Sequence, residues 1–243
     1  MGSFTFARLL PEMLGLNGSS QNASILASYL NHGGHDVKIL DIHSSGDAPL
    51  QVDAVCVGSG SASSLLPAAT SIISLVSAIS RWRSAGALVM AVGTGWDLLG
   101  HTVTTPEGEV LPGAGIFASH ADHRGTRFSG EVTGVDHQGR ASAGYVNQVG
   151  AIALEAGGSA LMSVDDAVSG YPRSEGLVGE NLFATRLGGP ALALNPHWCQ
   201  DLAQALLEPR GEKLHRTEFH ERIGHAATRA RSLIDARLGV VRN

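Results

Sequence analysis

The stretch from Ala87 to Gly100 constrains the fold of this chain more than any other. Six consecutive apolar residues, 87–92, run directly into Gly93-Thr94-Gly95, and an apolar pattern typical of a helix follows. A continuous apolar run of this length, bounded by glycine, is typical of a strand buried on both faces of a parallel sheet. Glycine after such a strand permits the sharp turn on which many α/β enzymes place a catalytic Ser or Cys. Here the apex of the turn is Gly93, so the turn is predicted but its nucleophile is missing.

Strand and helix patterns alternate along the rest of the chain, as they do in α/β domains. Leu9 to Gly18 predicts a short strand that passes into a glycine-rich loop. Helices are also predicted at 22–31, 65–83 and 218–238 and after Asn195-Pro196, and strands at 36–42, 53–57, 128–135 and 141–146. A chain of 243 residues can bury one sizeable core, so we expect a single domain.

Charge and cysteine usage exclude several classes of protein. The net charge of −5 provides no general attraction to nucleic acid or to an anionic membrane. Cys56 and Cys199 do not form a disulfide framework, and Cys56 lies within an apolar strand pattern, which indicates core packing. The N-terminus shows no secretory signal, and Ser, Arg or Gly interrupts each apolar stretch, so we expect no membrane span. These features predict a cytoplasmic protein.

Two short patterns could suggest a bound metal or nucleotide. His120-Ala121-Asp122-His123 has possible metal ligands three residues apart, but no second cluster at ligand spacing accompanies it. Gly58-Ser59-Gly60 follows a strand, as phosphate-binding loops do, yet it lacks a third glycine, and Asp165 is too distant to bind a ribose. We therefore expect neither a metal nor a cofactor.

The segment from Ala91 to Gly100 resembles the nucleophile turn of class I glutamine amidotransferases. The resemblance is strongest to the glutaminase subunit of lipid II isoglutaminyl synthase (GatD-like) and to its CobB/CobQ-like relatives, which read Ala-Ile-Cys-Gly-Gly-Tyr-Gln-Leu-Leu-Gly here. It places their catalytic Cys on Gly93 and their Gln on Asp97.

Three further segments extend the resemblance over nearly the whole chain. Thr105 to Phe117 is similar to the family's Thr-Pro-Asp-Gly-Glu-Arg-Leu-Pro-Gly-Leu-Gly-Leu. Glu180 to Pro190 is similar to Gly-Asn-Val-Phe-Gly-Thr-Tyr-Leu-His-Gly-Pro, in which the general-base His falls on Gly188. In the second hairpin strand, the family's Glu and His fall on Val146 and Gln148.

The resemblance implies a fold and a pocket. The fold is a three-layer, flavodoxin-like α/β domain with a mostly parallel central sheet, spanning residues 1–243 and ending in a C-terminal helix within 213–243. A glycine loop at Gly58 and Gly60 would preserve the backbone donor of the oxyanion hole, because backbone donors require only the shape of the loop. The implied vestigial pocket is formed by Gly58, Gly60, Gly93, Thr94, Asp97, Gln148 and Gly188.

Glutamine hydrolysis requires a thiolate nucleophile and a His that shuttles protons. Gly93 and Gly188 have no side chain, and Thr94 lies one residue past the apex, so we expect no catalytic residue of the family type. We also expect the loss of two side chains to enlarge the pocket.

Three hypotheses for function remain open. The first is a catalytically degenerate, non-hydrolysing subunit or scaffold for a Mur-ligase-like (MurT-like) partner in peptidoglycan metabolism of the cell wall, since the active relatives bind such a partner. The second is a binder or sensor of a small molecule that uses the vestigial pocket. The third is an enzyme with new chemistry that uses residues such as Asp97 or His101.

Overall fold

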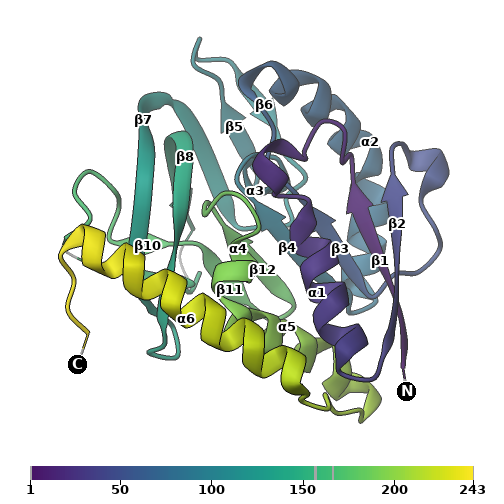
Figure 1. The fold of residues 1–243 in the computed structure, drawn as a ribbon. Helices are drawn as coiled ribbons and strands as arrows, with labels where there is room; N and C mark the ends of the chain where they lie inside the picture. The colour runs from purple at the N-terminus through teal and green to yellow at the C-terminus, as the bar shows by residue number, and fades with distance from the viewer. Residues whose placement is uncertain (1, 156–157, 166, 243) are drawn as a thin grey trace.

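The computed structural model describes residues 2–155, 158–165 and 167–242, and its centre is a six-stranded sheet (Figure 1). Its five parallel strands, numbered among themselves along the chain, lie in the order 2-1-3-4-5, which is the flavodoxin-like order. An antiparallel edge strand follows, which confirms the predicted mostly parallel sheet. From edge to edge the strands are β2 (Asp36–Ile42), β1 (Ser3–Leu9), β3 (Ala54–Val57), β4 (Leu88–Val92), β12 (Leu182–Thr185) and β11 (Leu177–Gly179).

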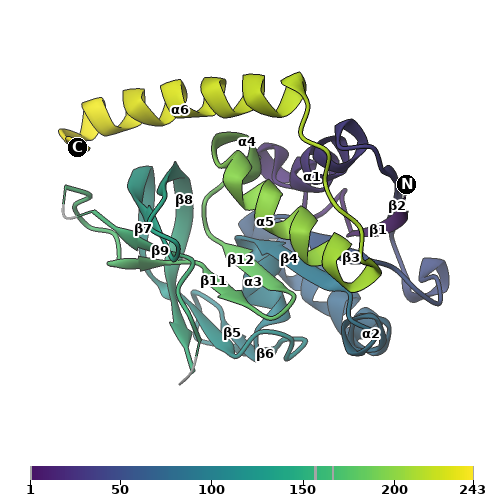
Figure 2. The same cartoon turned by 90° about the horizontal axis from the view of Figure 1, so that it is seen from below.

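Helices cover both faces of this sheet, because alternate side chains of each buried strand point in opposite directions. Val55 and Val57 pack with Ile79 on one face, whereas Ala54 packs with Trp198 on the other. Figure 2 shows α2 on the first face and α1 and α5 on the second, which gives three layers. These helices are α1 (Gln21–His32), α2 (Leu65–Ser84) and α5 (Pro196–Leu207).

The C-terminal helix, α6 (Glu218–Leu238), lies outside α5 and the short α4 (Ala191–Leu194) and reaches the second sheet (Figures 1 and 2). The helix begins at Glu218 and ends at Leu238, as the apolar pattern predicts. Residues 213–217, which belong to the predicted C-terminal segment 213–243, are not helical.

A second sheet flanks the three layers and was not foreseen from the pattern. It is dominated by a long hairpin, which extends well beyond the predicted strands at 128–135 and 141–146. The extra residues are 119–127, most of which are polar, and 147–154, most of which are partly buried. The strands are β5 (Thr102–Thr104), β6 (Val110–Pro112), β7 (Ser119–Asp136), β8 (Ala141–Leu154), β9 (Met162–Val164) and β10 (Ser174–Glu175).

One prediction is wrong in detail, and one premise, that no apolar stretch is long enough to span a bilayer, does not hold. The first strand occupies Ser3–Leu9 and not the residues after Leu9. Leu10 has a positive φ of 49°, which ends the strand. Leu10 and Leu14 are apolar because they are buried, although they lie in a loop. In addition, the 23 residues Ala62–Ser84 are long and apolar enough, by length and composition, to cross a membrane. This window contains α2, whose buried face packs against the sheet, and core helices of soluble proteins pass the same test.

A buried carboxylate joins the hairpin to α5. Asp136 ends β7 and accepts hydrogen bonds from Nε of Arg140, at 2.8 Å, and from Nε1 of Trp198, at 3.2 Å. Burial acts to raise the pKa of Asp136, but the hydrogen bonds from Arg140 and Gln138 hold it below its ordinary value. Arg140 also pairs with Asp201 on α5, so charged groups connect the second sheet to α5 at this corner.

We expect His197, which lies at this corner, to make the protein less stable in mild acid. Burial first, and then the guanidinium groups of Arg140 and Arg231, lower the pKa of His197 to about 4, against the opposing effect of Asp136 and Asp201. The unfolded chain binds this proton near pH 6.5 and the folded chain only near pH 4, so stability is lost as the pH falls through this window.

Replacing His197 by Gln should therefore reduce the pH dependence of the free energy of unfolding between pH 7.5 and 4.5 by roughly 1–3 kcal/mol. Urea unfolding at both pH values measures the effect. His225→Gln, on the exposed surface of α6, is the control and should follow the wild type. An unchanged pH slope in His197→Gln would contradict the assignment.

Candidate functional site

The predicted sharp turn connects β4 to the short helix α3 (Thr94–Leu99) and is confirmed. Gly93 has φ of 53° and ψ of −122°, a conformation that residues with a side chain rarely adopt. Its N–H donates to the carbonyl of Thr185 at 2.8 Å, and its carbonyl accepts from the N–H groups of Trp96 and Asp97. These bonds hold the apex at the carboxyl end of the sheet, where doubly wound folds bind their ligands.

The space beside Gly93 is already filled. A Cβ atom on Gly93 would lie 2.5 Å from Oγ of Ser59 and closer still to Nε2 of Gln148. These two side chains also contact each other, since Gln148 Nε2 donates to Ser59 Oγ at 3.3 Å. The expectation that two missing side chains enlarge the pocket is therefore wrong at Gly93. At Gly188, by contrast, the nearest atom to a Cβ would be the Tyr145 carbonyl oxygen at 3.4 Å.

The glycine loop after β3 is tightly packed against the loop that follows β1. The N–H of Ser59 donates to Oγ of Ser19 at 2.7 Å, so this backbone donor is not free. A Cβ on Gly58 would overlap the Leu14 carbonyl, which explains why a glycine is present there. Thr94 links α3 to this glycine loop, because its hydroxyl donates a hydrogen bond to the carbonyl of Gly60 at 3.1 Å.

Asp97 and His123 form a pair behind the turn. The Asp97 side chain is fully buried, and its Oδ2 lies 2.9 Å from Nε2 of His123. Because a carboxylate oxygen accepts, this contact requires the tautomer with a proton on Nε2. Oδ1 of Asp97 has no hydrogen-bond partner among the described residues.

The histidines of the 120–123 segment do not converge on a metal. His120 contacts Thr102 at 2.8 Å and Glu155 at 3.1 Å, whereas His123 contacts Asp97. Over residues 2–155, 158–165 and 167–242, no group of three or more His, Cys, Asp or Glu is arranged to hold a metal ion. His101 lies beside His120 and Glu155, and it does not line the cavity described next.

A cavity of about 760 Å³ opens beside the turn. Of the residues predicted to form the pocket, Gly60, Thr94, Gln148 and Gly188 line it, and Gly58, Gly93 and Asp97 do not. Asp97 reaches the cavity through His123, which does line it. The sequence pattern missed Ser59, His123 and Arg127, all of which also line the cavity. The remaining polar lining residues include Asn17, Ser61, Thr105, Glu107, Glu109 and Asn147.

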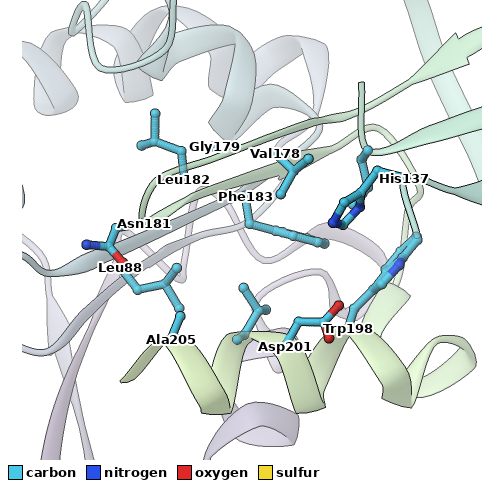
Figure 3. Close-up of a pocket in the computed structure, with 12 residues that line it drawn as sticks. Leu88, His137, Val178, Gly179, Asn181, Leu182, Phe183, Trp198, Asp201 and Ala205 are labelled. Atoms are coloured by element: carbon cyan, nitrogen blue, oxygen red, sulfur yellow. The ribbon is translucent and has the colours of Figure 1, made fainter. Parts of the chain in front are cut away.

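A smaller cavity, of about 100 Å³, lies at the other end of β4 (Figure 3). Leu88, Phe183 and Trp198 make most of its wall apolar, with His137 and Asp201 at one side. It is formed between α5 and the sheet and is remote from the turn, so we do not include it in the candidate site.

Replacing Gly93 by Ala tests the crowding at the turn. We expect a loss of roughly 2–4 kcal/mol in the free energy of unfolding, from backbone strain and from overlap with Ser59 and Gln148. Gly139→Ala is the matched control, because Gly139 has a φ of 79° but nothing within 4 Å of its Cβ position. It should cost only about 1 kcal/mol.

Urea unfolding of both variants gives the difference that is due to crowding. The double variant Gly93→Ala with Gln148→Ala should regain part of the loss, because the closest neighbour has been removed. A Gly93→Ala cost no larger than that of Gly139→Ala would show that the space is open.

Known proteins share this architecture. A family model described as the CobB/CobQ-like glutamine amidotransferase domain matches residues 20–196. No curated protein sequence gives a match. A crystal structure of a glutamine amidotransferase is 14% identical with a TM-score of 0.53, covering 81% of this chain and 98% of that chain. A structure of PurLQS from Thermotoga maritima is 13% identical with a TM-score of 0.51, covering 84% of this chain and 98% of that chain. At these identities the solved structures show the fold alone.

Proposed function

The chain belongs to the family of CobB/CobQ-like glutamine amidotransferase domains. We propose that this member of the family binds a small polar molecule and does not hydrolyse glutamine. The observation that carries the proposal is the turn itself. Its apex is a glycine whose side-chain space is filled by Ser59 and Gln148, while a cavity of about 760 Å³ remains beside it.

The chain has no thiol that could replace the missing nucleophile. Its two cysteines, Cys56 and Cys199, are both buried. Burial raises the pKa of the Cys56 thiol to about 12 and also raises that of Cys199. A thiol with a raised pKa is largely protonated at neutral pH and is a poor nucleophile. Neither cysteine can therefore take the place of the family nucleophile. In this proposal, Gly93 and Gly188 stand at the positions of the family nucleophile and base.

The cavity provides what a bound small molecule requires. Its volume of about 760 Å³ lies within the range of ligand pockets, roughly 300–1,000 Å³. Thr94, Asn147 and Gln148 offer uncharged donors and acceptors, and His123 offers a ring nitrogen, Nδ1, that has no partner among the described residues. Asp97 fixes the orientation of that ring, as a buried carboxylate does for an imidazole in many sites.

A second candidate function is that of a subunit, and the rim of the cavity favours it. Leu16, Leu66 and Tyr145 line the cavity and are 46%, 55% and 45% exposed. Val110, on β6, is 60% exposed. Large apolar side chains gathered at a rim can dock a protein partner. Under this candidate the partner is a Mur-ligase-like enzyme of the cytoplasm, in peptidoglycan metabolism of the cell wall, and it closes over the same cavity.

We expect the purified protein to release no ammonia from glutamine. The double variant Gly93→Cys with Gly188→His should also remain inactive, because a side chain at position 93 meets Ser59 and Gln148. A coupled ammonia assay measures both proteins, with a heat-inactivated sample as the background. Ammonia release by the wild type above that background would overturn the proposal, and turnover by the double variant would show that the filled space is not the obstacle.

We expect a ligand to accompany the wild-type protein from its native cell, and native mass spectrometry should detect it as an added mass. Gly188→Leu should lose this mass, since the new side chain enters the cavity with room at its Cβ position. Gly224→Leu on α6, where nothing lies within 4 Å of the Cβ position, is the matched control and should keep it. Equal retention by both variants would place the ligand elsewhere.

A further inference from the structure

A second cavity, of about 310 Å³, adjoins the large one. Arg127 and Gln148 line both cavities, so these two side chains form part of the wall between them. The second cavity is built from the β7–β8 hairpin, from the segment at Tyr171, and from Arg186, the residue directly after β12.

Arg186 is buried here, with only 6% of its surface exposed. Its guanidinium donates from Nη1 to the carbonyl of Gly150 and from Nη2 to that of Val149, both at 2.8 Å. Nε is buried and has no hydrogen-bond partner among the described residues. Backbone carbonyls satisfy some of the donors, but they do not balance the positive charge.

No carboxylate in the described part of the chain lies within ion-pair distance of this guanidinium. Asp122 lines the same cavity, but it is paired with Arg124 at 2.7 Å. Glu175 is near in sequence, and its carboxylate accepts from the Arg186 backbone N–H, from the Thr185 hydroxyl and from the Tyr171 hydroxyl. Its hydrogen bonds are thus made to groups other than the guanidinium.

A buried charge is costly unless an opposite charge accompanies it. Guanidinium groups also match carboxylates and phosphates, which accept two parallel hydrogen bonds from them. We propose that the 310 Å³ cavity is an anion subsite in which the Arg186 guanidinium binds a carboxylate or phosphate group. Arg127, which is exposed and makes one hydrogen bond to Asn147, supplies a second cation at its entrance.

The shared wall extends this assignment to the ligand of the large cavity. A molecule with its body beside Thr94 and His123 can place an anionic group past Gln148 against Arg186, since both cavities meet at that side chain. The inference names a ligand class for the proposed function, but binding of a free anion to Arg186 does not require that function. The competing explanation is that Glu175 balances Arg186 at longer range, and then no anion should bind.

The test is an NMR titration of ¹⁵N-labelled full-length protein with inorganic phosphate or with sodium acetate, with sodium chloride at matched ionic strength as the blank. We expect a saturable shift of the Arg186 Nε–Hε signal and of the Gly150 and Ala151 amides. Response to phosphate alone assigns a phosphate-bearing ligand, and response to acetate alone assigns a carboxylate. Both support the subsite, whereas no saturable shift with either overturns it.

Arg186→Met should weaken the anion affinity, read from the Gly150 and Ala151 amides, by about tenfold or more, the effect expected for losing a charge-assisted hydrogen bond. Arg229→Gln, which removes an exposed arginine on α6, is the matched control and should stay within about twofold of the wild type. Unchanged affinity in Arg186→Met would overturn the proposal.

If Arg186→Met does not fold, the Arg186 Nε–Hε signal of the wild type decides the outcome. Arg127→Met, at an exposed position, should then weaken the anion a few-fold. These outcomes are separate from the proposed function. A protein that binds no anion can still bind an uncharged ligand without hydrolysing glutamine, and detection of glutaminase activity would leave the anion subsite in place.

Discussion

The backbone conformation of Gly93 is the constraint on which the rest of the site depends. β4 is buried along its whole length between β3 and β12, so its direction is fixed by the sheet. The chain can enter α3 within one residue only because position 93 adopts a φ of 53°. That turn directs Asp97 to His123 and presents Thr94 to the glycine loop after β3. A wider turn would separate all of these groups.

The abundance of glycine around the turn has a related physical cause. A Cβ on Gly58 would meet the Leu14 carbonyl, and one on Gly95 would lie 2.9 Å from the carbonyl oxygen of Val57. The loops after β1, β3 and β4 thus approach one another at backbone distance. This contact accounts for the glycines without any phosphate ligand, and it places Ser59 where its side chain fills the space beside Gly93.

The features that were predictable from sequence are those encoded by local patterns. The buried strand at 88–92, its sharp turn and the helix at 218–238 follow from apolar runs, glycine and helical spacing. The filled space beside Gly93 depends on Ser59 and Gln148, which are 89 residues apart in the chain. The partner of Asp97 is 26 residues away, and the burial of Arg186 is set by carbonyls 36 and 37 residues distant. No local pattern reports such pairings, and the hairpin that carries many of them extends beyond the strands that the sequence predicts at 128–135 and 141–146.

Gln148 is the side chain at which the turn and the buried guanidinium meet. Its amide donates to Ser59 on one side, and it lines both the large cavity and the one that contains Arg186. An amide offers donors and an acceptor without a charge, so it can close the space beside Gly93 and add no charge to either cavity. A carboxylate in that wall would compete with a bound anion for Arg186, and a cation would add to an unbalanced charge. A neutral side chain at position 148 can therefore fill the space beside Gly93 and still leave the Arg186 guanidinium free to bind an anion in the neighbouring cavity.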